Sequence, residues 1–203
     1  KKVSYIPQNH ATVYAYSVLD MVMMGTTVYL GRFQNPGRKQ RIAAEKALET
    51  MKIRHLKDRS FSEISGGEQQ MVLIARALAQ QTKILIMDEP CSNLDYGNQI
   101  RLMRALKELA KQGYLVIQST HNPEHVFLFA DEVLVIREGI VEAMGDVDRT
   151  LTEELLQRVY GVKVNLHEMQ GAHRKFCIPD EKEISYRHNQ DLFYEDRELS
   201  IGK

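Results

Sequence analysis

Residues 84–90 read Ile-Leu-Ile-Met-Asp-Glu-Pro, and this stretch decides the fold class. A continuous apolar run that ends in polar residues is typical of a strand buried on both faces of a parallel sheet. Open α/β sheets bind ligands at the carboxyl ends of such strands. There, Asp88 is suited to hold Mg²⁺ and Glu89 to polarise an attacking water. The alternative is that the two acids merely end a strand and open a turn before Pro90.

The elements around this strand predict an α/β protein. Further apolar runs that indicate strands lie at 3–6, 114–118 and 133–136. Helical patterns lie at 17–24, 41–51, 65–80, 98–112 and 123–130. Because strands and helices alternate after residue 80, we expect residues 81–145 to form half of a doubly wound sheet, in which 114–118 is a second buried strand. Residues 10–80 are expected to be a helical insertion, whose first helix stops at Gly25.

Beyond residue 150 the pattern is weaker. We expect a helix at 151–160 and a hairpin that pairs 162–166 with 174–178 around Gln170 and Gly171. After Asp180 the chain is rich in charge and has few clustered apolar residues, so a weakly ordered tail is expected.

Ser65-Gly66-Gly67-Glu68 opens the helix at 65–80. Ser-x-x-Glu is a capping box, in which the side chains of Ser65 and Glu68 each bind the other residue's backbone N–H. A cap does not need two adjacent glycines, however. Glycines permit close approach of a ligand to the backbone, and the N-terminus of a helix attracts anions. A plain cap and a phosphate site therefore both stay open.

His121 comes shortly after the strand at 114–118, so we expect it at the same sheet edge as Asp88 and Glu89. The other six histidines lack such a placement. A lone histidine after a strand is compatible with a structural role as well as with acid–base chemistry. Gln8 follows the strand at 3–6 and carries no signal by itself.

The composition excludes several classes of protein. The chain has 203 residues, 43% hydrophobic and 27% charged, which is enough for one domain with a full core. Lys plus Arg and Asp plus Glu each number 27, and a formal net charge of zero argues against a nucleic-acid binder. Two cysteines without a C-x-x-C motif argue against a disulfide framework or a zinc site.

The order of these motifs resembles the ATP-binding-cassette (ABC) ATPases. Gln8 is similar to the Q-loop of that family, 64–69 to its signature motif and 84–89 to its Walker B strand. Residues 92–95 resemble the D-loop and His121 the switch histidine. The resemblance covers about residues 1–165. It implies an α/β fold, with a partial RecA-like P-loop NTPase core of parallel sheet flanked by helices, and an α-helical signature subdomain.

The resemblance implies a defined site. In such ATPases two subunits enclose two ATP molecules, and the signature helix of one subunit meets the γ-phosphate held by the other. Glu89 would be the general base and His121 would contact the γ-phosphate. Asp88 and Gln8 would hold Mg²⁺. The residues expected on the nucleotide side are Gln8, Ser65, Gly66, Gly67, Glu68 and Asp95.

The resemblance also implies partners and a location. A second ATPase subunit, most simply a second copy, would complete each site, and permease subunits would hold the pair at the cytoplasmic face of the cell membrane. A substrate-binding protein would act indirectly, and no nucleic acid is expected. Residues 16–31, 73–80 and 160–162 resemble importers of iron chelates, siderophores and cobalamin. ATP hydrolysis would thus power the uptake of such a substrate.

One family motif does not occur in the sequence. The phosphate loop G-x-x-x-x-G-K-[S/T] (Walker A), whose amides and lysine hold the β- and γ-phosphates, is missing. Because the chain starts with Lys1 and opens in an apolar alternation, we expect the carboxyl-terminal portion of a longer subunit, inactive alone. A natural short protein without the loop is the alternative.

Two other functions compete with that of an importer ATPase. One is a catalytically incomplete ABC-like regulatory or partner module that completes a neighbour's site. The other is an ABC ATPase of DNA repair, which is disfavoured because those proteins carry a long coiled coil between the Q-loop and the signature motif. Here the stretch between Gln8 and Ser65 is short and has no heptads.

Four parts are predicted. Residues 1–9 would end a core strand and form the Q-loop, and 10–80 would be the helical subdomain with the signature motif. Residues 81–150 would be the RecA-like core with Walker B, D-loop and switch histidine. Residues 151–203 would be a carboxyl-terminal extension and tail.

Overall fold

The computed structural model describes residues 2–8, 15–31, 34–169 and 174–180. The chain divides into two compact units, residues 1–122 and 123–203. The boundary after Asn122 lies inside the range 81–150, which we predict from the sequence as one part. The four ranges themselves stay a prediction.

Three parallel strands form the sheet of the first unit. They are β1 (Val3–Ile6), β2 (Ile84–Met87) and β3 (Leu115–Gln118), and β2 lies in the middle. The register pairs Ile6 with Met87 and Met87 with Gln118, so the three strands end at the same level. The predicted parallel sheet is confirmed.

Helices cover one face of this sheet. α3 (Gly66–Leu78) contacts β1, and α4 (Tyr96–Lys111) contacts β3. The residues buried on the covered face of β1 and β2 are Ser4, Ile6, Leu85 and Met87. On the opposite face, Tyr5 is 59% exposed and Leu115 is 54% exposed. Within the described residues of 1–122 no helix covers that second face, so the prediction that 84–87 and 114–118 are buried on both faces is wrong for this unit taken by itself.

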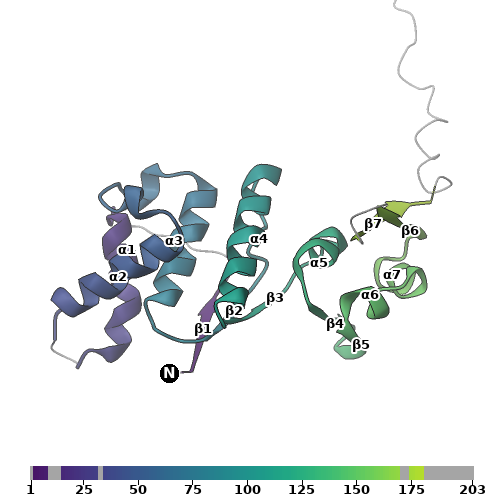
Figure 1. Ribbon diagram of the computed structural model, residues 1–203, viewed down its shortest axis with the longest axis horizontal. Coiled ribbons are helices and arrows are strands. Elements are labelled where there is room, and N and C mark those ends of the chain that lie inside the picture. Colours follow the sequence, from purple (N-terminus) through teal and green to yellow (C-terminus); the bar gives the residue numbers. More distant parts are fainter. Residues whose placement is uncertain (1, 9–14, 32–33, 170–173, 181–203) are drawn as a thin grey trace, which may run out of the picture. The chain divides into compact units, whose positions relative to one another are not determined.

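Three helices of the first unit pack on one another: α1 (Val18–Thr26), α2 (Arg38–Thr50) and α3. Figure 1 shows this group. The short 3₁₀ turns η1 (Thr27–Tyr29), η2 (Arg54–Leu56) and η3 (Phe61–Glu63) lie in the same stretch of the sequence. Apolar side chains at helical spacing fill its interior, and Val18, Val22, Leu48 and Ile74 are fully buried. The helices predicted at 17–24, 41–51 and 65–80 are thus confirmed as α1, α2 and α3.

Gly25 lies inside α1 and does not end it, so that prediction is wrong. A Cβ atom at this position would overlap the main-chain oxygen of Arg76 in α3. The glycine lets the backbones of α1 and α3 approach one another closely. Helix periodicity within α1 does not reveal this requirement, because it is set by a residue of another helix.

The capping box at α3 is formed as predicted. Ser65 is the N-cap, and its Oγ accepts a hydrogen bond from the Glu68 N–H at 3.4 Å. The Glu68 carboxylate accepts from both the N–H and the hydroxyl of Ser65, each at 2.8 Å. These bonds, the backbone one first, hold the pKa of Glu68 below its ordinary value.

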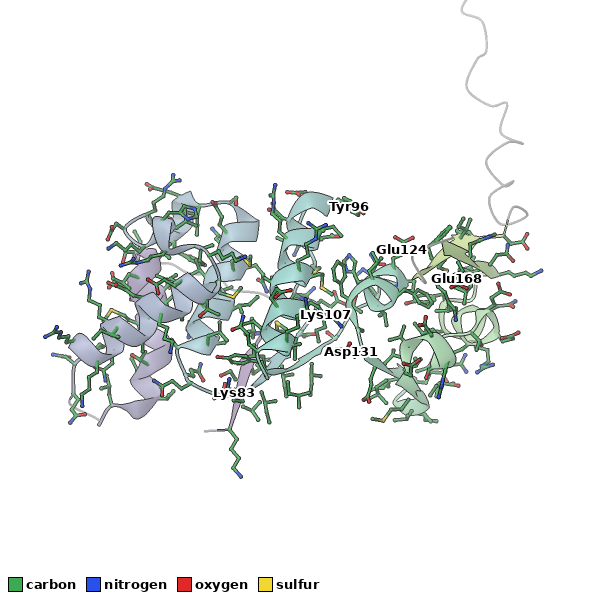
Figure 2. All side chains as sticks on the ribbon, in the orientation of Figure 1. Lys83, Tyr96, Lys107, Glu124, Asp131 and Glu168 are labelled. Carbon is green, nitrogen blue, oxygen red and sulfur yellow. The ribbon has the colours of Figure 1, made fainter. Side chains whose placement is uncertain are left out.

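Lys83 and Tyr114 mark the other end of the sheet, just before β2 and β3 begin. The Lys83 ammonium lies 4.0 Å from the centre of the Tyr114 ring, and Figure 2 labels Lys83 at this end. Such a cation–π contact is worth about 0.5–1 kcal/mol at an exposed site. It joins the starts of two neighbouring strands.

The second unit holds two antiparallel hairpins and short helices. In chain order these are α5 (Pro123–Phe129), β4 (Glu132–Arg137), β5 (Ile140–Asp146), α6 (Val147–Thr150), α7 (Glu153–Tyr160), β6 (Val164–Met169) and β7 (Arg174–Pro179). The predicted hairpin near the carboxyl end is confirmed as β6 and β7, although its turn at 170–173 lies outside the described residues. The predicted tail after Asp180 also lies outside them.

The strand predicted at 133–136 does not join the parallel sheet. It forms β4, which pairs antiparallel with β5. The pattern predicts a strand correctly but cannot tell its partner, since Gly139 allows a tight turn directly back onto β4. A small core of Val135, Val147, Leu151, Leu155, Leu156 and Val164 holds this unit together. Among the described residues, no helix is long and apolar enough to cross a bilayer.

We predict that Gly25→Ala destabilises the chain. Alanine raises helix propensity by about 1 kcal/mol, but its methyl group would collide with the Arg76 carbonyl, and overpacking typically costs about 1–3 kcal/mol. Urea unfolding should show a lower midpoint. Gly66→Ala is the matched control, since the nearest atom to a Cβ there is Leu94 Cδ2 at 3.9 Å. A Gly25→Ala protein as stable as Gly66→Ala would contradict the close helix contact.

A second prediction concerns the pH dependence of the cap. Because the folded pKa of Glu68 is depressed, its contribution to the free energy of unfolding is present above the ordinary pKa of 4.5 and is lost as the pH falls below it. Glu68→Gln should therefore differ from the parent more at about pH 7 than at about pH 3.5. Ser65→Ala should cost about 1 kcal/mol at neutral pH. If the difference in free energy of unfolding between the parent and Glu68→Gln did not change with pH, the proposed link between the Glu68 pKa and stability would be ruled out.

Candidate functional site

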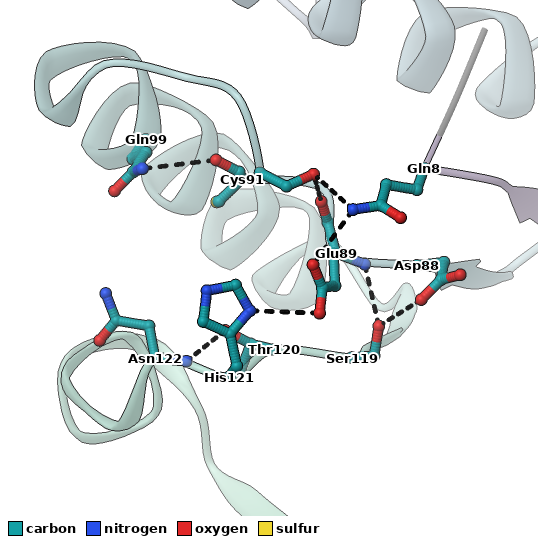
Figure 3. Close-up of polar contacts among 10 residues, drawn as sticks. Gln8, Asp88, Glu89, Cys91, Gln99, Ser119, Thr120, His121 and Asn122 are labelled. Atoms are coloured by element: carbon teal, nitrogen blue, oxygen red, sulfur yellow. Dashed lines mark hydrogen bonds and ion pairs between the residues drawn. The ribbon is translucent and has the colours of Figure 1, made fainter.

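The in-register strands bring residues from distant parts of the sequence to one edge of the sheet. Gln8 follows β1, Asp88 and Glu89 follow β2, and His121 follows β3. Figure 3 shows their side chains converging, with Glu89 between Gln8 and His121. This is the carboxyl edge, where open α/β sheets bind ligands. Their chemical roles stay predictions.

The Glu89 carboxylate is held by one partner on each oxygen. Gln8 Nε2 donates to Oε2 at 3.2 Å, and His121 Nδ1 lies 3.1 Å from Oε1. An ionised carboxylate only accepts hydrogen bonds, so with Glu89 ionised it is His121 Nδ1 that donates in this contact. The carboxylate is half-buried and the His121 ring is exposed. Glu89 is therefore oriented by two residues that come from neighbouring strands.

Two serine hydroxyls bind the main chain of Glu89. Ser119 Oγ accepts from the Glu89 N–H at 2.9 Å, and Ser92 Oγ donates to the Glu89 carbonyl at 2.8 Å. Ser92 Oγ also accepts from Gln8 Nε2 at 3.2 Å. Ser92 belongs to the predicted D-loop, but neither serine is among the site residues that the sequence indicates. The available signal is a hydroxyl residue directly after a strand for Ser119 and in the following turn for Ser92, and both are common in turns.

Asp88 offers a carboxylate suited to a hard cation. Ser119 Oγ donates to its Oδ1 at 2.7 Å, and within the described residues Oδ2 accepts no hydrogen bond. No group of three or more His, Cys, Asp or Glu side chains in the described ranges could hold a metal ion by itself. Mg²⁺ that arrives with nucleotide phosphates needs only one or two protein carboxylates. Asp88 thus fits the part that the sequence predicts for it.

Asp95 is the N-cap of α4. Its carboxylate accepts from the N–H of Asn98 at 2.9 Å and from the Asn98 side-chain amide at 2.6 Å, and these bonds, the backbone one first, lower its pKa. Arg101 in turn donates to the Asn98 side-chain oxygen at 3.0 Å. The predicted D-loop residue therefore has a structural role in the chain as described.

The start of α3 lies against the start of α4. A Cβ atom at Gly67 would come within 2.6 Å of Asn98 Cγ, and one at Gly66 would have only Leu94 within 4 Å. The Ser65–Gly67 turn and the Asp95 cap are thus neighbours. Among the described residues, no hydrogen bond links this pair of helix starts to the Glu89 carboxylate, whose partners are Gln8 and His121.

Cys91 lies in the sequence between Glu89 and Asp95, and its side chain is half-buried. Burial raises the pKa of its thiol to about 11, so little thiolate, the reactive form, is present at neutral pH. Its carbonyl accepts from Gln99 Nε2 at 3.4 Å, and that amide also donates to the Leu94 carbonyl at 2.8 Å. The loop after Glu89 is thereby tied to α4 (Figure 3).

Comparison with known proteins gives one family. Residues 1–92 match the family described as ABC transporter. An uncharacterised ABC transporter ATP-binding protein of Haemophilus influenzae is 42% identical over 174 residues, covering 85% of this chain and 66% of that protein. A manganese transport system ATP-binding protein of Listeria monocytogenes is 36% identical, covering 79% of this chain and 68% of the relative. The chain spans about two thirds of the length of these relatives.

A solved structure also points to the ABC transporter family. A metal-chelate type ABC transporter in an inward-facing conformation superposes with a TM-score of 0.84 at 30% identity, covering 90% of this chain and 75% of that one. The predicted fold class, a parallel sheet flanked by helices as in ABC cassettes, is confirmed by other cassette structures as well. From these similarities we conclude that the chain belongs to the ATP-binding proteins of the ABC transporter family.

Proposed function

We propose that the chain works in the ATP-hydrolysing subunit of an ABC importer that takes up a metal ion or a metal chelate. The observation that carries this proposal is the environment of Glu89. Its carboxylate is bound by Gln8 and His121, and Asp88 lies directly before it in the chain. An oriented carboxylate beside a cation ligand is what activation of a water molecule requires.

Each residue has a defined part in the proposed mechanism. Bound ATP and Mg²⁺ supply the phosphoryl group and the charge neutralisation that its transfer needs. Glu89 would accept the proton of the attacking water, and Asp88 with Gln8 would hold the cation. His121 contacts the γ-phosphate and orients Glu89 through Nδ1. The main contribution of the protein is positioning, because hydrolysis involves little covalent chemistry on the enzyme.

The helix start at Ser65–Glu68 serves a second nucleotide in this proposal. The N–H groups of Ser65 and Glu68 bind within the capping box, so the N–H groups of Gly66 and Gly67 are the ones that would meet the γ-phosphate held by a second ATPase subunit. Asp95, next to this start through Asn98, would communicate between the two subunits. A homodimer at the cytoplasmic face of the membrane, attached to permease subunits and served indirectly by a substrate-binding protein, is the proposed assembly.

The proposed cargo rests on resemblance. The Listeria relative is named for manganese transport and the superposed structure for metal-chelate transport, which supports a metal or its chelate. Within that class we propose an iron chelate, a siderophore or a cobalamin-like molecule, on the residues at 16–31, 73–80 and 160–162. The alternative function is an ABC-like partner module that completes a neighbour's site without hydrolysing ATP itself.

Glu89→Gln tests the proposal in the subunit as its gene encodes it. Glutamine keeps the shape of the side chain and removes the base, so ATP should still bind while phosphate release falls by about 10²–10⁴-fold. Glu108→Gln, an exposed site on α4, is the control and should keep the parent rate. An unchanged hydrolysis rate in Glu89→Gln would show that Glu89 only ends a strand and would favour the partner-module alternative.

A further prediction concerns residues 1–203 alone. They contain no G-x-x-x-x-G-K-[S/T] run, whose backbone amides and lysine hold the β- and γ-phosphates in this family. A protein of these residues should bind ATP weakly in calorimetric titration and release little phosphate. Tight binding with robust turnover would mean that other residues of this chain hold the nucleotide.

A further inference from the structure

Glu89 has a backbone conformation that a residue with a side chain rarely adopts. Its φ is 42°, in the left-handed region, where contacts between Cβ and the backbone are unfavourable. Such a conformation persists only when neighbouring groups fix it. The direction of the Glu89 side chain from the sheet edge depends on this backbone geometry.

Two hydrogen bonds fix the peptide groups on either side of Glu89. The N–H belongs to the peptide shared with Asp88 and binds Ser119 Oγ at 2.9 Å. The carbonyl belongs to the peptide shared with Pro90 and binds Ser92 Oγ at 2.8 Å. Ser119 comes from the end of β3 and Ser92 from the turn after β2, so the two bonds reach Glu89 from different segments.

Ser119 also binds the Asp88 carboxylate. Its hydroxyl has a single proton, which goes to Asp88 Oδ1 at 2.7 Å, while its oxygen accepts the Glu89 N–H. Figure 3 shows both bonds at the one oxygen atom. The same hydroxyl therefore sets the position of the Glu89 main chain and the orientation of the Asp88 carboxylate.

We propose that Ser119 is a positioning residue for ATP hydrolysis, which holds the general base and the cation ligand in a fixed relation to one another. This inference rests on the proposed function, in which Glu89 accepts the proton of water and Asp88 binds Mg²⁺. Ser119 acts through these two residues and does not touch the nucleotide. Hydrogen bonds to the ligands of a metal orient those ligands, and their loss typically costs about 10–100-fold in affinity or activity.

Ser119→Ala and Ser119→Thr in the subunit as its gene encodes it provide the test. Alanine should lower kcat by about 10–100-fold and raise the Mg²⁺ concentration for half-maximal rate, with little change in KM for ATP. Threonine keeps the hydroxyl, and position 119 is exposed, which leaves room for the extra methyl group. It should restore most of the rate and the Mg²⁺ dependence.

Thr120→Ala is the matched control. Its hydroxyl accepts from the Asn122 N–H at 3.1 Å, and among the described residues no hydrogen bond joins it to Glu89 or Asp88, so the parent rate should be kept. Urea unfolding of each variant separates lost positioning from lost folding. Parent-like kinetics in Ser119→Ala, a Ser119→Thr protein as slow as Ser119→Ala, or an equal loss in Thr120→Ala would each overturn the inference.

Glu89→Gln, measured alongside, separates this inference from the proposed function. Collapse of hydrolysis in Glu89→Gln with parent-like Ser119→Ala would overturn the role of Ser119 alone. Parent-like hydrolysis in Glu89→Gln would overturn the proposed function, and with it a role for Ser119 that acts through Glu89.

Discussion

The parallel register of three short strands is the constraint on which the rest of the site depends. Ile6, Met87 and Gln118 are partners across the sheet, so each strand delivers its next residues to the same edge. Side chains in a strand alternate between faces, and a shift by one residue would turn every side chain to the opposite face. Gln8 and His121 reach the two oxygens of Glu89 only because the strands end level.

The loops that lead into α3 and α4 are held in the same way, by a glutamine side chain in the first turn of each helix. Ser65 and Asp95 are the N-caps, and the fourth residue after each is a glutamine, Gln69 or Gln99. Each side-chain amide donates to the carbonyls five and eight residues before it, which are Ile64 and Phe61 for the first and Leu94 and Cys91 for the second. Both helix starts are thereby held against the preceding loop, so the geometry at their N–H groups is defined without a ligand.

How much the sequence predicts depends on whether the signal is local. The strands at 3–6, 84–87 and 115–118 and the cap at Ser65 follow from apolar runs and spacing within a few residues. The partner of β4, the exposed face of the sheet and the need for glycine at position 25 depend on other segments, so periodicity does not reveal them. The sequence does not reveal the contacts of Ser119 for the same reason, because a hydroxyl after a strand becomes informative only when Asp88 and Glu89 lie beside it. The catalytic roles themselves remain predictions.

Glycine is favoured at positions 66 and 67, at the start of α3, for two different physical reasons. From the sequence, both permit a ligand to approach the backbone. In the structure, Gly67 faces Asn98 at a distance that leaves no room for a Cβ atom, and Asn98 is held by Asp95 and Arg101. Packing within the chain therefore accounts for glycine at position 67 without any ligand. At Gly66 the space is open, so close approach by a phosphate remains the physical argument for glycine there.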